Sequence, residues 1–85
     1  MNKFNFVKKV SKQDKIKCLK DTMKKNAEAI DYVEECLNIA KDRLSYNEND
    51  VQSQIDKEQL EYIKFTLYYL DKMYMKSFRT LGGKL

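Results

Sequence analysis

Residues 16–44 have the sequence IKCLKDTMKKNAEAIDYVEECLNIAKDRL, in which apolar side chains recur in steps of three and four. The repeat stays in phase through Asn26, which occupies a position where an apolar residue is expected. Such spacing is typical of a helix that buries one stripe against a partner helix. We call this stripe the first seam, and its members are Ile16, Leu19, Met23, Ile30, Val33, Leu37, Ala40 and Leu44.

A second seam follows the turn-like residues 45–50, which read SYNEND. Its members are Leu60, Ile63, Leu67, Leu70, Tyr74 and Leu81, with Ser77 at one further position. A short connection between long helices makes them antiparallel neighbours. The sequence therefore predicts an all-α fold, an antiparallel helical hairpin with helices over residues 12–45 and 51–81.

Several alternatives to a lone hairpin remain open. Two hairpins can pair into a dimeric four-helix bundle, in which Asn26 would set register and oligomeric state. A break near Asn26 would instead give a three-helix bundle, although the unbroken phase argues against it. Residues 1–10 are expected to form a basic N-terminal segment, either a tail or a short helix, beside a single domain at 11–85.

Composition limits the class of protein. The chain has 85 residues, enough for one domain with a thin core. Charged residues make up 35% and apolar residues 42%, and the two glycines stand at the C-terminal end. No secretory signal or membrane-length apolar run is visible, so we expect a cytoplasmic protein whose cysteines, Cys18 and Cys36, are reduced.

The second predicted helix is more apolar than a two-helix seam requires. Aromatic and methionine side chains also lie off its seam, and a helix that is apolar on several sides is normally buried on several sides. Tyrosine and methionine are common at protein interfaces. The excess could be covered by the N-terminal segment, by a second copy of the chain or by another protein. The residues we predict for this interface are Tyr62, Phe65, Tyr69, Met73 and Phe78.

Charge is sorted along the chain. Residues 1–25 hold nine lysines and two aspartates, residues 26–63 hold ten acidic and three basic residues, and residues 64–85 hold five basic and one acidic residue. A hairpin would therefore have a basic open end and an acidic turn end. The basic end is a candidate for contacts with nucleic-acid phosphates. The lysines concerned are Lys8, Lys9, Lys12, Lys15, Lys17, Lys20, Lys24 and Lys25.

The residue types do not indicate an enzyme. The chain has no histidine, no glycine-rich phosphate loop and no paired-cysteine metal motif. We therefore expect no cofactor, no metal and no small-molecule substrate. The first hypothesis is a non-catalytic interaction protein, a small regulator or inhibitor that binds itself and another protein. The alternatives are a sequence-nonspecific nucleic-acid-binding accessory protein and a membrane-surface or immunity-type helical bundle protein.

Overall fold

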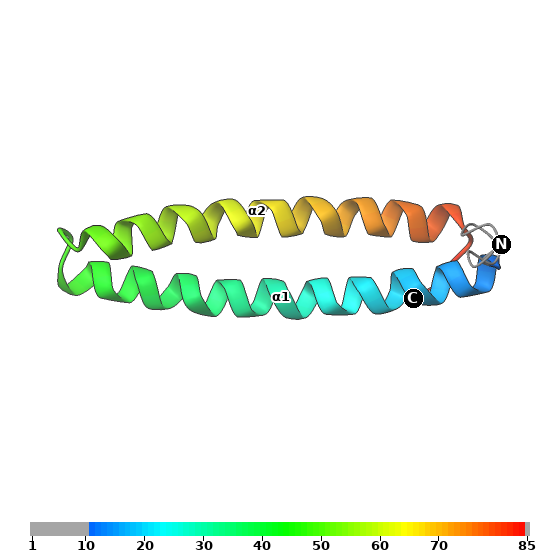
Figure 1. The fold of residues 1–85 in the computed structure, drawn as a ribbon, viewed down its shortest axis with the longest axis horizontal. Coiled ribbons are helices and arrows are strands. Elements are labelled where there is room, and N and C mark those ends of the chain that lie inside the picture. Colours follow the sequence, from blue (N-terminus) through cyan, green and yellow to red (C-terminus); the bar gives the residue numbers. More distant parts are fainter. Residues whose placement is uncertain (1–10, 85) are drawn as a thin grey trace, which may run out of the picture.

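The computed structural model describes residues 11–84 and shows two long helices lying antiparallel (Figure 1). Helix α1 spans Lys12–Tyr46 and helix α2 spans Val51–Thr80. The all-α hairpin is confirmed, with helix boundaries within one residue of those predicted. The three-helix alternative is wrong, because α1 continues without a break through Asn26. The predicted N-terminal segment, residues 1–10, lies outside the described residues.

Both helices begin at a side-chain cap. The hydroxyl of Ser11 accepts a hydrogen bond of 3.1 Å from the backbone N–H of Asp14. At α2, the carboxylate of Asp50 accepts bonds from the backbone N–H of Ser53 at 3.2 Å and from its hydroxyl at 3.0 Å. The backbone N–H of Ser53, followed by its hydroxyl, lowers the pKa of Asp50 because both donate to the charged form. These caps satisfy N–H groups that a helix leaves unpaired in its first turn.

Helix α2 ends in a glycine turn that folds back over Phe78. The N–H of Gly82 donates to the carbonyl of Arg79 and that of Gly83 to the carbonyl of Phe78, both at 2.9 Å. Gly82 has a φ of 83°, a conformation that favours glycine. A Cβ on Gly83 would stand 2.6 Å from the Phe78 ring. Gly83 therefore covers the Phe78 ring at the end of the hairpin where α1 begins and α2 ends, and Phe78 is only 1% exposed.

The first seam faces α2 as its spacing predicts. Four of its members are buried, namely Met23, Ile30, Leu37 and Ala40, and the other four are half-buried. Asn26 is buried within it, and its side-chain amide donates a 2.9 Å hydrogen bond to the backbone carbonyl of Leu67 in α2. Because this bond joins one position on each helix, it favours a single register of α1 along α2. The side chain of Asn26 thus makes its hydrogen bond within a single hairpin.

The predicted membership of the second seam is partly wrong, because α2 is rotated about its own axis relative to the prediction. Ile63 is exposed while its neighbour Lys64 is half-buried, and Ser77 is exposed while Phe78 is buried. Successive residues point about 100° apart around a helix, so a small rotation exchanges neighbours between the packed and the exposed sides. This rotation buries Phe78 in place of the smaller Ser77. At position 64, the aliphatic part of the lysine side chain can pack on α1 while its ammonium group stays in water.

Candidate functional site

Four of the five predicted interface residues lie together on the side of α2 that faces away from α1. Tyr62 and Phe65 are each 75% exposed, and Tyr69 and Met73 are 64% and 50% exposed. A groove lined by Tyr62, Phe65 and Tyr69 runs between these rings. We call Tyr62, Phe65, Tyr69 and Met73 the aromatic row. Several large exposed apolar side chains that lie together usually mark a binding surface, whereas single exposed apolar residues are common on any protein.

Phe78, the fifth predicted interface residue, does not belong to this surface. It follows Tyr69 by nine residues, which is about half a turn around the helix axis, so the two rings point in opposite directions. Phe78 is buried against α1 and the glycine turn. Its assignment to an exposed interface is therefore corrected: within this chain it is a core residue.

Three residues of the aromatic row, Tyr62, Tyr69 and Met73, belong to a wider strip of α2 that contains no charged residue, and Phe65 lies outside this strip. At about 100° per residue, all nine charged side chains of Val51–Thr80 fall on the remaining part of the helix circumference. We call this strip the uncharged face. It includes residues that were not among the predicted interface residues. The absence of charge along one side of α2 is the sequence signal that could have identified them. Its members are Val51, Gln52, Ile55, Gln59, Tyr62, Ile63, Thr66, Tyr69, Leu70, Met73, Ser77 and Thr80.

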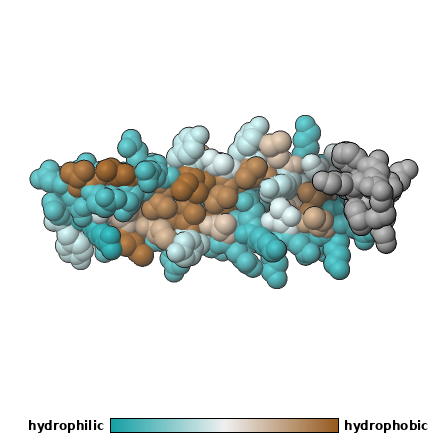
Figure 2. Space-filling model, in the orientation of Figure 1, coloured by the Kyte–Doolittle hydropathy of each residue, from teal (hydrophilic) through white to brown (hydrophobic). Residues whose placement is uncertain are grey.

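Helix α1 extends this surface across the hairpin. Tyr32, Ile39 and Tyr46 follow one another at seven-residue spacing and are all exposed. Between the helices lies a groove of about 180 Å³, in which one charged residue from each helix stands among the apolar ones. Its lining residues are Cys36, Ile39, Ala40 and Arg43 of α1 and Asp56 and Leu60 of α2. Figure 2 shows that apolar surface runs along the middle of the molecule over both helices, with polar surface on either side.

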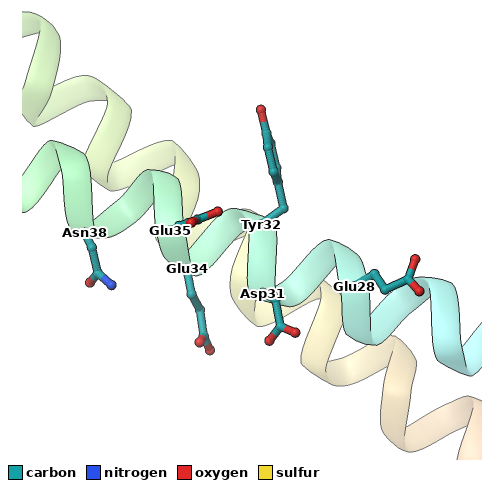
Figure 3. A pocket seen from close by; sticks show the side chains of 6 residues that line it. All are labelled: Glu28, Asp31, Tyr32, Glu34, Glu35 and Asn38. Atoms are coloured by element: carbon teal, nitrogen blue, oxygen red, sulfur yellow. The ribbon is translucent and has the colours of Figure 1, made fainter.

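A polar cluster joins the two helices through Glu34. Its carboxylate accepts a 2.6 Å hydrogen bond from the Tyr68 hydroxyl and lies 3.9 Å from the Lys64 ammonium, which is 5.9 Å from the centre of the Tyr68 ring. The hydrogen bond to Glu34 is the main cause that raises the pKa of Tyr68, since ionisation would place two negative charges side by side. Figure 3 shows that Glu34 and Tyr32 project from opposite sides of α1, so the cluster is separate from the exposed apolar side chains of α1. On α2, Tyr68 also lines the groove beside the aromatic row.

The acidic residues of α1 do not converge on a point. Figure 3 shows Asp31 and Glu34 pointing to one side of α1, whereas Glu28 and Glu35, which line the same depression, point away from them. Among residues 11–84, no three cysteine or acidic side chains stand close enough to hold a metal ion. This depression is a solvated helix surface.

The lysines predicted for nucleic-acid contacts are distributed around α1. Lys12, Lys15, Lys17, Lys20, Lys24 and Lys25 are all exposed, but their spacing sends them to several sides of the helix instead of one stripe. Lys8 and Lys9 lie outside the described residues. A nucleic-acid surface is usually a basic patch or stripe on one face. The nucleic-acid alternative stays a prediction.

Neither helix of the described part of the chain is long and apolar enough to cross a membrane. The membrane-surface alternative depends on residues 1–10 and stays a prediction. Comparison of the chain with protein-family models, with curated proteins and with solved structures finds no match in any of the three.

Proposed function

We propose that this chain is a non-catalytic protein-interaction module that acts through the aromatic row and the uncharged face of α2. The observation that carries the proposal is the exposure of the four row residues, each at least half exposed. Three of them, Tyr62, Tyr69 and Met73, lie on a side of α2 that holds no charged residue. In the proposal, the chain works as a small regulator or inhibitor by occupying a surface of its partner.

The energetics favour a partner for this surface. Burying one large apolar side chain fully is worth about 1.5–3 kcal/mol, so the row offers substantial association energy when it is covered. Tyrosine combines an apolar ring with a hydroxyl that can keep a hydrogen bond at the wet edge of an interface. The core, in contrast, buries few large apolar residues, namely Met23, Ile30, Leu37 and Phe78. A thin core with a wide apolar exterior suits a protein that gains stability on binding.

The test substitutes residues of the aromatic row and keeps the packing between α1 and α2 unchanged. A variant carrying Tyr62→Ser, Phe65→Ser and Tyr69→Ser removes exposed apolar surface without touching the core. A matched control carries Asp31→Ser, Asn38→Ser and Lys41→Ser, three exposed replacements on α1. Circular dichroism verifies that both variants keep the helical content of the native chain.

Each protein is then used as bait for cross-linking in an extract of its source cells, together with a differently tagged copy of the same chain. We expect the native chain and the control to capture the same partners, copies of the chain included, and the row variant to lose them. Equal capture by all three proteins would refute the proposal.

A further inference from the structure

We infer that the uncharged face binds a second copy of this chain, with the two α2 helices antiparallel to each other. The inference deepens the proposed function by naming the partner of the same surface, and it rests on that proposal. Three observations carry it: the distribution of charge along α2, the position of two exposed charges beside the face, and the length of the uncharged face.

Charge along α2 changes sign near the middle of the helix. The half next to the turn holds three acidic residues, Asp56, Glu58 and Glu61, and two basic ones, Lys57 and Lys64. The half next to the open end holds three basic residues, Lys72, Lys76 and Arg79, and one acidic one, Asp71. The first half is net acidic and the second net basic. Two copies placed antiparallel bring the acidic half of each α2 beside the basic half of the other, whereas a parallel pair would place like charges together.

Glu58 and Lys76 make this complementarity specific. Both are exposed, and they are eighteen residues apart, which is about five helical turns, so they stand on the same edge of the uncharged face. Tyr62 and Tyr69 lie between them on the face. When two α2 helices cross antiparallel near their middles, Glu58 of each copy lies within about one turn of Lys76 of the other.

The face runs the whole length of α2. Helix α2 has 30 residues, so at about 1.5 Å per residue the face is about 45 Å long. Figure 2 shows that apolar surface continues from there toward the groove between the helices. With a width of about 10 Å, that of one helix, the face offers about 450 Å² on each copy. A standard protein interface buries about 800 Å² on each partner, so the face alone would form a small interface.

Sedimentation of charge-reversal variants tests the arrangement. The native chain is expected to sediment as a dimer at micromolar concentration. Glu58→Lys or Lys76→Glu alone should raise the dissociation constant by about tenfold or more, since each creates two like-charge contacts in an antiparallel pair. The double variant carrying both reversals should restore native association, because each contact again joins opposite charges.

The matched controls are Asp31→Lys and Lys24→Glu, which change the net charge equally at exposed positions of α1. They should leave the dissociation constant unchanged. A dimer that is indifferent to the single reversals would overturn the antiparallel arrangement. A strictly monomeric native chain that still captures another protein through the aromatic row would overturn this inference alone, whereas loss of all row-dependent capture would also remove the proposed function.

Discussion

The side of α2 that packs on α1 and the uncharged face on its other side are built from different residues. The packed side holds Ser53, Leu60, Leu67 and Phe78, but half-buried charged residues such as Lys64 and Asp71 stand among them. The uncharged face also holds large apolar side chains, such as Tyr62, Ile63 and Met73, but no charge along the length of the helix. A surface that always meets water has no physical reason to exclude charge, whereas the centre of an interface does. The outward side thus has the more interface-like composition of the two.

Two phenylalanines on opposite sides of α2 provide the largest expected difference. Phe78→Ala should lower the free energy of unfolding by about 3–5 kcal/mol, because the ring is buried and leaves a cavity. Phe65→Ala should change it by no more than about 0.5 kcal/mol in the monomer, because that ring is exposed. Urea unfolding followed by circular dichroism at low protein concentration measures both. Equal losses for the two variants would contradict the assignment of the faces.

The glycine turn sharpens the same comparison at the open end. Gly83→Ala should cost about 1–3 kcal/mol, because the added methyl group overpacks against the Phe78 ring. Lys84→Ala, at the next and exposed position, is the control and should be neutral. Thermal unfolding of both variants measures the difference. A neutral Gly83→Ala would show that the turn does not close over Phe78.

Asn26 tests how α1 is held in register on the packed side. Asn26→Asp keeps the shape but replaces the amide donor with an acceptor, so a buried carboxyl then faces the carbonyl of Leu67. We expect a loss of about 1–3 kcal/mol in the free energy of unfolding at neutral pH. Asn38→Asp makes the same chemical change at an exposed site of α1 and should be nearly neutral. Similar urea midpoints for the two variants would argue against the hydrogen bond.

The smallest expected effect concerns Tyr68 and Glu34 at the edge of the packed side. The hydrogen bond to Glu34 raises the pKa of Tyr68 in the folded state, so its contribution to stability is present below the ordinary pKa of tyrosine. That contribution is lost as the pH rises through the raised pKa. Tyr68→Phe should lack this alkaline loss, whereas Tyr69→Phe, on the uncharged face, should keep it. Thermal unfolding across an alkaline pH series compares the two, and identical profiles would contradict the assignment.

Much of the fold could be predicted because its signals are local. The first seam and the turn at 45–50 each depend on residues close together in sequence, and the structure contains both. The rotation of α2 could not be predicted from spacing alone. With apolar residues on both sides of that helix, a pattern that includes Ile63 and Ser77 fits the period as well as one that includes Lys64 and Phe78.

The candidate site was predicted in part for the same reason. Composition indicated that α2 carries more aromatic surface than one partner helix can cover, and Tyr62, Phe65, Tyr69 and Met73 are exposed in the structure. Phe78 was misassigned because its burial depends on two tertiary features, the rotation of α2 toward α1 and the return of Gly83 to the ring after the helix has ended. A contact made by a turn that folds back on a helix leaves no periodic signal within the helix.

The sequence by itself determined that two helices form, where the chain turns between them, and that charge and aromatic residues are sorted along and around α2. Only the tertiary structure decided which side of α2 packs on α1, and therefore which rings are exposed. The physical reason is that helical periodicity records the angles between side chains but not the rotation of the helix as a whole. That rotation is selected by contacts between distant residues, such as Asn26 with Leu67 and Glu34 with Tyr68.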